Sequence, residues 1–97
     1  MATDDDPLIR SLRQQVSDND VALVAAMNRR LELVERMWRY KESRGLEVLD
    51  PEREEWMLRY LGRANRGPLS TAGLEELFAA VLELTKKELR ARTEPRG

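Results

Sequence analysis

The stretch from Pro7 to Ser43 contains no residue that must end a helix, and this feature constrains the fold most. Asp6 followed by Pro7 is typical of a helix N-cap with proline at the first helical position, and the next strong breaker is Gly45. Alternating steps of three and four residues trace a heptad-like seam, interrupted by two polar residues: Ile9, Leu12, Val16, Asn19, Leu23, Ala26, Arg30, Leu33, Met37 and Tyr40. We therefore expect one long helix over about residues 7–43, with residues 17–20 as the alternative start of a separate helix.

Two shorter helices are expected after the long one. Asp50 and Pro51 repeat the cap-plus-proline pattern, and that helix ends near Asn65, before Gly67 and Pro68. Ser70 is the expected cap of a third helix, whose seam runs along these residues: Leu74, Leu77, Phe78, Val81, Leu82, Thr85 and Leu89. The predicted fold class is therefore all-α.

A second apolar stripe on the long helix predicts more than one neighbour for it. The stripe contains Val24, Met27, Leu31, Val34 and Trp38, and it widens the apolar arc beyond a two-stranded seam. At about 1.5 Å per residue the long helix is about 54 Å in length and the short ones about 21 and 30 Å. One chain cannot cover so wide an arc, so we expect a homodimer in which two long helices pair and the short helices cover them.

Composition excludes several classes of function. The 97 residues predict a single domain over residues 1–97, with an ordered core of about 7–91. Seventeen basic and eighteen acidic residues give a net charge of -1, which argues against nucleic acid or an anionic membrane as partner. With no His and no Cys, imidazole bases, thiol nucleophiles and Cys/His metal sites are ruled out. Because neither a signal peptide nor a membrane span is recognisable, we expect a cytoplasmic protein.

Basic residues interrupt the apolar stripes of the long helix. Arg30 and Lys41 are eleven residues apart, so they project from nearly the same side, about 16 Å from each other. Arg13 lies about 100° off that face and is expected to reach the pocket of a partner subunit. The alternatives are a snorkelling Lys41 near a helix end and an Arg30 that pairs with Glu35 or with a carboxylate at an interface.

The start of the second helix carries three charged residues on one face. Asp50, Arg53 and Glu54 stand at i, i+3 and i+4. An isolated string of this kind usually reflects helix capping and favourable charge at the helix N-terminus. A binding role for it depends on combination with the basic residues upstream.

The order and spacing of these charged residues match a known pattern. The spacing from Arg13 to Arg30 to Lys41, followed by the D-x-x-R-E string at Asp50, resembles the all-helical AroQ-class chorismate mutases of the shikimate pathway, over about eighty residues from Ile9 to Leu89. The resemblance implies an intertwined homodimer with two active sites. It also implies that chorismate is converted to prephenate by a Claisen rearrangement, as in aromatic amino acid biosynthesis, without a cofactor or metal.

The resemblance also assigns roles to individual residues. Arg30 and the partner subunit's Arg13 would grip the two substrate carboxylates, and Lys41 would donate to the ether oxygen and one carboxylate. Arg53 would orient the site. Asp50 and Glu54 would receive the substrate hydroxyl and its neighbours.

The third helix departs from the family's pattern. The family usually has Ser or Thr followed four residues later by Gln or Glu, which is the second donor to the ether oxygen. Thr85 fits the first position, but Leu89 stands at the second and cannot donate. Glu88 is adjacent, about 100° round the helix, and is the alternative occupant.

Other functions remain open at this point. An isochorismate pyruvate-lyase or a 4-amino-4-deoxychorismate mutase would share the Arg/Lys clamp, and the Leu89 anomaly leaves room for an amino-substituted substrate. A non-catalytic helical dimer or regulatory subunit would need only the apolar heptad-like seam of the long helix. Activation by a partner enzyme of the shikimate pathway is a further possibility.

Overall fold

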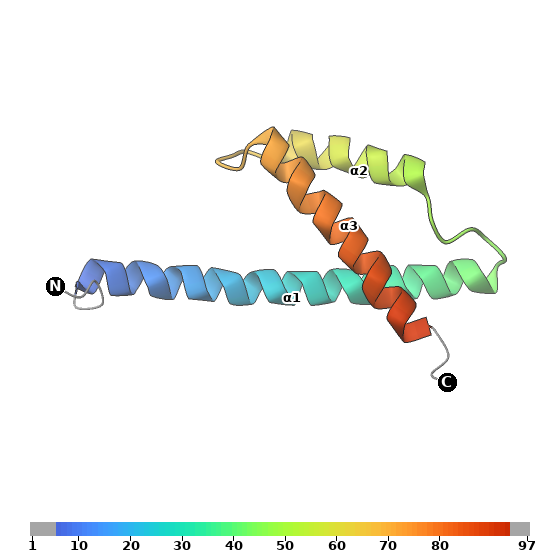
Figure 1. Cartoon of the computed structure of the whole chain (residues 1–97), viewed down its shortest axis with the longest axis horizontal. Coiled ribbons are helices and arrows are strands. Elements are labelled where there is room, and N and C mark those ends of the chain that lie inside the picture. The colour runs from blue at the N-terminus through green and yellow to red at the C-terminus, as the bar shows by residue number, and fades with distance from the viewer. Residues whose placement is uncertain (1–5, 94–97) are drawn as a thin grey trace. The chain divides into compact units, whose positions relative to one another are not determined.

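The computed structural model describes residues 6–93 and confirms an all-α fold (Figure 1). Its three helices are α1 (Pro7–Ser43), α2 (Pro51–Ala64) and α3 (Thr71–Thr93). Residues 1–5 and 94–97, which lie beyond the predicted ordered core of about 7–91, are outside the described residues. The chain divides inside α1 into two units, Met1–Arg36 and Met37–Gly97. The element order is the one predicted, with one long helix followed by two shorter ones.

Helix α1 is continuous, so the alternative of a break at residues 17–20 is excluded. The Asp6 carboxylate caps its start by accepting a 2.9 Å hydrogen bond from the backbone N–H of Leu8. Around residues 17–20, where helix propensity is low, the Gln14 side-chain amide donates to the Asp18 carboxylate at 2.9 Å, one turn away. This local pair supports the helix where poor helix formers follow one another.

The end of α1 is fixed by backbone hydrogen bonds around Gly45. The N–H of Leu46 donates to the carbonyl of Lys41 at 2.8 Å, and the N–H of Gly45 donates to that of Glu42 at 3.1 Å. This is the Schellman arrangement, which needs a left-handed residue just past the helix. Gly45 supplies it with φ of 68°, at no steric cost because it lacks a Cβ. The chain therefore turns at Gly45, directly after the last turn of α1, which contains Lys41.

The boundaries of the two shorter helices follow from side-chain caps. Asp50 accepts from the backbone N–H of Arg53 at 3.1 Å, and Ser70 accepts from that of Gly73 at 3.0 Å. Asn65 is the C-cap of α2. The predicted starts of α2 and α3 and the predicted end of α2 are therefore confirmed.

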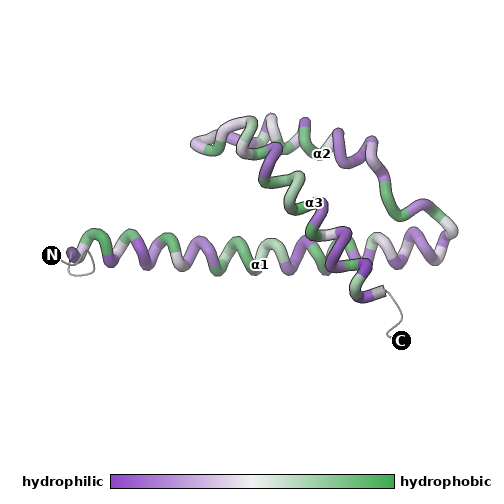
Figure 2. Tube along the Cα trace, in the orientation of Figure 1, coloured by the Kyte–Doolittle hydropathy of each residue, from purple (hydrophilic) through white to green (hydrophobic). Residues whose placement is uncertain are grey.

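The two apolar stripes of α1 differ in exposure. The seam is exposed, with 46–60% of the residue surface accessible at these positions: Leu12, Val16, Leu23, Leu33, Met37 and Tyr40. Leu31 of the second stripe is buried and Met27, Val34 and Trp38 are half-buried, whereas Val24 at its start is exposed. Figure 2 shows hydrophobic positions recurring along the whole of α1. Much of the seam is thus left uncovered in a single chain.

Helices α2 and α3 contact each other within the unit Met37–Gly97. On α3, Leu74, Thr85 and Leu89 are buried, whereas Leu77 of the predicted seam is exposed. On α2, Met57 and Leu61 are half-buried. No helix among residues 6–93 is long and apolar enough to span a membrane.

Candidate active site

The candidate site residues are divided between the two units of the chain. Arg13 and Arg30 belong to Met1–Arg36. The remaining candidates belong to Met37–Gly97: Lys41, Asp50, Arg53, Glu54, Thr85, Glu88 and Leu89. Most of the candidate residues therefore belong to one unit, Met37–Gly97, and their contacts with one another lie within it.

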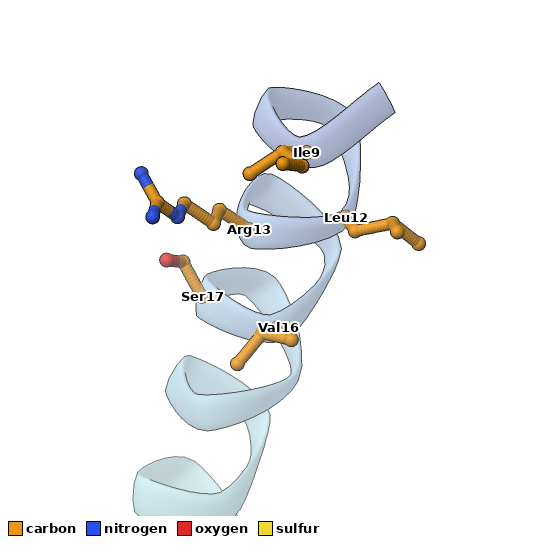
Figure 3. Close-up of a pocket in the computed structure, with 5 residues that line it drawn as sticks. All are labelled: Ile9, Leu12, Arg13, Val16 and Ser17. Carbon is orange, nitrogen blue, oxygen red and sulfur yellow. The ribbon is translucent and has the colours of Figure 1, made fainter. Parts of the chain in front are cut away.

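Arg13 lies on an exposed, largely apolar part of α1. It lines a shallow hollow on the helix surface together with Ile9, Leu12, Val16 and Ser17 (Figure 3). Arg13 and Ser17 project from one side of the helix, and Leu12 projects from the other. Arg30, by contrast, is half-buried. Arg13 thus presents a cation beside exposed apolar surface, the setting expected of a residue that acts across an interface.

Lys41 is held by the connection between α1 and α2. Its side chain is half-buried, and its ammonium donates to the carbonyl oxygen of Val48 at 3.4 Å. Its own carbonyl accepts from the N–H of Leu46. The turn after the helix therefore orients both ends of this residue. An ammonium has three N–H donors, so the same group can also bind an anion.

The three charged residues at the start of α2 do not act on one common partner. Asp50 caps the helix, so its predicted local role is confirmed. The Arg53 guanidinium lies 3.9 Å from the centroid of the Trp56 ring, in a cation–π contact. Glu54 forms an ion pair with Lys86 of α3. Sequence spacing placed these side chains on one face, and the structure gives each a different neighbour.

Trp56 is not a core residue of the single chain. It is exposed and stacks on Tyr60, with ring centroids 5.1 Å apart and an interplanar angle of 9°. The half-buried face of α2 is the one that carries Met57 and Leu61, so Trp56 lies on the exposed side of this helix. The Trp56 ring, backed by Tyr60, instead forms a platform for the Arg53 guanidinium.

Lys86 is a charged residue near the candidate site that sequence reasoning missed. Its Nζ lies 3.1 Å from Oε1 of Glu54, which joins α3 to α2. Nothing in the sequence distinguishes Lys86 from its neighbour Lys87, since both read as basic residues toward the end of a helix. Only the packing of α3 on α2 turns one of them toward Glu54.

In the region of α3 that departs from the family's pattern, two of the three candidate residues are buried. Thr85 is 4% exposed and its hydroxyl donates to the Val81 carbonyl at 2.7 Å. Leu89 is 1% exposed, whereas Glu88 is exposed. Of the two candidates for the second position, Leu89 is the one packed inward.

Comparison with known proteins decides the family. The family model of chorismate mutase type II matches residues 12–89. The chain belongs to the chorismate mutase type II family. The family's members are isomerases of aromatic amino acid biosynthesis, so the resemblance drawn from the spacing of charged residues is confirmed.

A solved structure supports the same assignment. The chorismate mutase (form II) from Thermus thermophilus is similar, with a TM-score of 0.81 and 29% sequence identity. The match covers 90% of this chain and 98% of that chain. A search of curated proteins gives no match.

Proposed function

We propose that this member of the chorismate mutase type II family rearranges chorismate to prephenate in a homodimer with two active sites. The observation that carries the proposal is the family match, because residues 12–89 include every candidate site residue from Arg13 to Leu89. The chemistry of these residues agrees with the reaction. They supply cations and hydrogen-bond acceptors rather than nucleophiles.

The reaction is an intramolecular rearrangement in which the ether C–O bond breaks as a new C–C bond forms. It needs no proton transfer or covalent intermediate. The enzyme has to hold a flexible dicarboxylate in its compact conformer and to stabilise negative charge that develops on the ether oxygen. Arginine and lysine side chains can do both.

In this proposal each cation has a defined task. Arg30 and the partner subunit's Arg13 bind the two carboxylates, with arginine as a bidentate clamp. Lys41, held at Val48, donates to the ether oxygen and one carboxylate. Arg53 orients the site from its platform on Trp56. Asp50 and Glu54 accept hydrogen bonds from the substrate hydroxyl and contact the atoms next to it.

The α3 residues Thr85, Glu88 and Leu89 complete the proposed site. Leu89 replaces the second donor to the ether oxygen, and Glu88 is exposed beside it. The transition state then depends on Lys41 for its main donor. We therefore expect turnover to be more sensitive to Lys41 than to any group of α3.

The dimer is supported by the exposed seam of α1. A run of large apolar side chains at 46–60% exposure is unfavourable in water and is typical of a surface that meets another chain. A second copy would cover it with an identical helix, and two-fold dimers are the commonest soluble assembly. Sedimentation of the purified chain tests this part, with a dimer expected at micromolar concentration.

The activity is tested by adding the purified chain to chorismate and following the ultraviolet absorbance of its conjugated diene. We expect the absorbance to fall and prephenate to accumulate. Isochorismate and 4-amino-4-deoxychorismate are measured in parallel. Release of pyruvate from isochorismate with no loss of chorismate would identify a lyase instead, and inactivity on all three compounds would support a non-catalytic dimer.

A further inference from the structure

The ion pair between Glu54 and Lys86 is partly shielded from solvent. The side chains are 30% and 24% exposed, respectively, at an N–O distance of 3.1 Å. The pair of Arg29 and Glu32 on the surface of α1 is 63% and 64% exposed at 3.5 Å. Exposed pairs are weakened by water and salt, whereas shielded charges act on each other and on a ligand more strongly. The positive charge of Lys86 therefore acts directly on the Glu54 carboxylate.

Lys86 is also the group that α3 presents to this carboxylate. The preceding Thr85 is buried, with its hydroxyl donating to the Val81 carbonyl, and Leu89 is apolar and buried. The next residue, Lys87, is exposed. Successive residues differ by about 100° around a helix, so only one of the two lysines can turn toward α2. Lys86, and not Lys87, is thus the lysine of α3 that pairs with Glu54.

A carboxylate paired with an ammonium differs chemically from a lone carboxylate. It still accepts hydrogen bonds, because each oxygen has lone pairs beyond those facing the lysine. The pair as a whole carries no net charge. A hydroxyl group needs only an acceptor and is bound well there. An ammonium group gains little from a neutralised carboxylate and is repelled by the lysine a few ångströms away.

We propose that Lys86 is a specificity-determining residue, which makes Glu54 select a hydroxyl over an ammonium group on the substrate. The inference rests on the proposed function, in which Glu54 receives the substrate hydroxyl. Chorismate and 4-amino-4-deoxychorismate differ at that substituent, and the amine is protonated near neutral pH, like the side chain of lysine. The charge of Lys86 then decides between a hydroxy and an amino substrate.

The test compares both compounds on the wild-type chain and on charge variants of Lys86. Lys86→Met removes the charge and keeps an unbranched side chain, and Lys86→Gln also keeps a hydrogen-bond donor for Glu54 should the methionine variant fold poorly. Lys87→Met is the matched control, since it removes the same charge from the exposed neighbour. Lys86→Arg preserves the charge. The readouts are kcat/KM and, by calorimetry, Kd for each compound.

We expect the wild-type chain to favour chorismate, and Lys86→Met and Lys86→Gln to shift the ratio of the two compounds toward the amine by about tenfold, as for a change of one close charge pair. Lys87→Met should leave the ratio within about twofold of wild type, because the charge it removes is exposed and screened. Lys86→Arg should do the same, because it keeps the positive charge beside Glu54. A purely structural Lys86 would weaken both compounds alike, so an unchanged ratio in a folded variant overturns the inference. A wild-type chain that binds both compounds but rearranges neither overturns the proposed function instead, and the Kd ratio still tests Lys86.

Discussion

The ammonium of Lys41 and the carbonyl oxygen of Val48 are joined by a 3.4 Å hydrogen bond that spans the turn between α1 and α2. The same turn is closed by the backbone bond from Leu46 to Lys41. A flexible four-carbon side chain is thereby restricted before any ligand binds. Restricting a charged donor in advance lowers the reorganisation needed when negative charge develops beside it.

Lys41→Ala should lower kcat by about 10²- to 10³-fold, the usual loss for one donor to a developing oxyanion in a water-excluded site. The control is Lys87→Ala on the exposed face of α3, which removes a lysine without touching the connection. Steady-state rates with chorismate and far-ultraviolet circular dichroism separate chemistry from folding. A Lys41→Ala chain within about threefold of wild type removes Lys41 from the mechanism, since such a change is far below the loss of an oxyanion donor.

Asp50 has a measurable structural role that is distinct from its proposed contact with substrate. Asp50→Ala should lower the free energy of unfolding by about 1 kcal/mol, because the N–H of Arg53 loses its cap. Asp50→Asn keeps the capping oxygen and should unfold at nearly the wild-type temperature. Thermal unfolding checks stability, and kcat/KM checks binding. If Asp50→Asn is as stable as wild type and as active, the negative charge of Asp50 has no role in substrate binding, and the capping oxygen is what matters.

Mixing two inactive variants tests whether the site is shared between subunits. Arg13→Ala and Arg30→Ala homodimers should both be inactive, since each site would lack one carboxylate clamp. After exchange of subunits, a heterodimer should regain about one intact site, as in any two-fold assembly with shared sites. Activity of the mixture, followed during exchange, is the measurement. A mixture as inactive as its parents shows that Arg13 and Arg30 do not serve one site from two chains.

Leu89→Gln should raise kcat by supplying the second donor to the ether oxygen. It should also lower the thermal midpoint, because Leu89 is 1% exposed and burial of an amide that lacks a full set of partners costs about 1–3 kcal/mol. Leu89→Met keeps the site apolar at similar volume and serves as the control. Rates are measured well below the midpoint of each variant. An amide that gives no more activity than the methionine shows that position 89 does not face the ether oxygen.

Glu88 offers the complementary test on α3. Because it is exposed, Glu88→Gln should change kcat by less than about twofold, as is usual for a surface substitution. The chorismate assay at several pH values checks this directly. A pronounced rise in activity at low pH in the wild type, abolished by Glu88→Gln, would identify Glu88 as the protonated donor in place of Leu89.

The ends of the helices were predictable because capping is local. Asp6, Asp50 and Ser70 each bond to a backbone N–H two or three residues away, so the information lies within one turn of the chain. The spacing of Arg13, Arg30 and Lys41 was readable for the same reason, since one uninterrupted helix fixes their register. The family therefore followed from the sequence by itself.

Tertiary structure decided which charged groups meet. Sequence spacing grouped Asp50, Arg53 and Glu54 on one face, but the packing of α3 on α2 gave Glu54 to Lys86. It also left Trp56 exposed beneath Arg53. Contacts between helices depend on which faces turn toward each other, and this is set by the sum of many small packing energies rather than by any local signal. Two adjacent lysines of equal propensity were thus distinguished only in three dimensions.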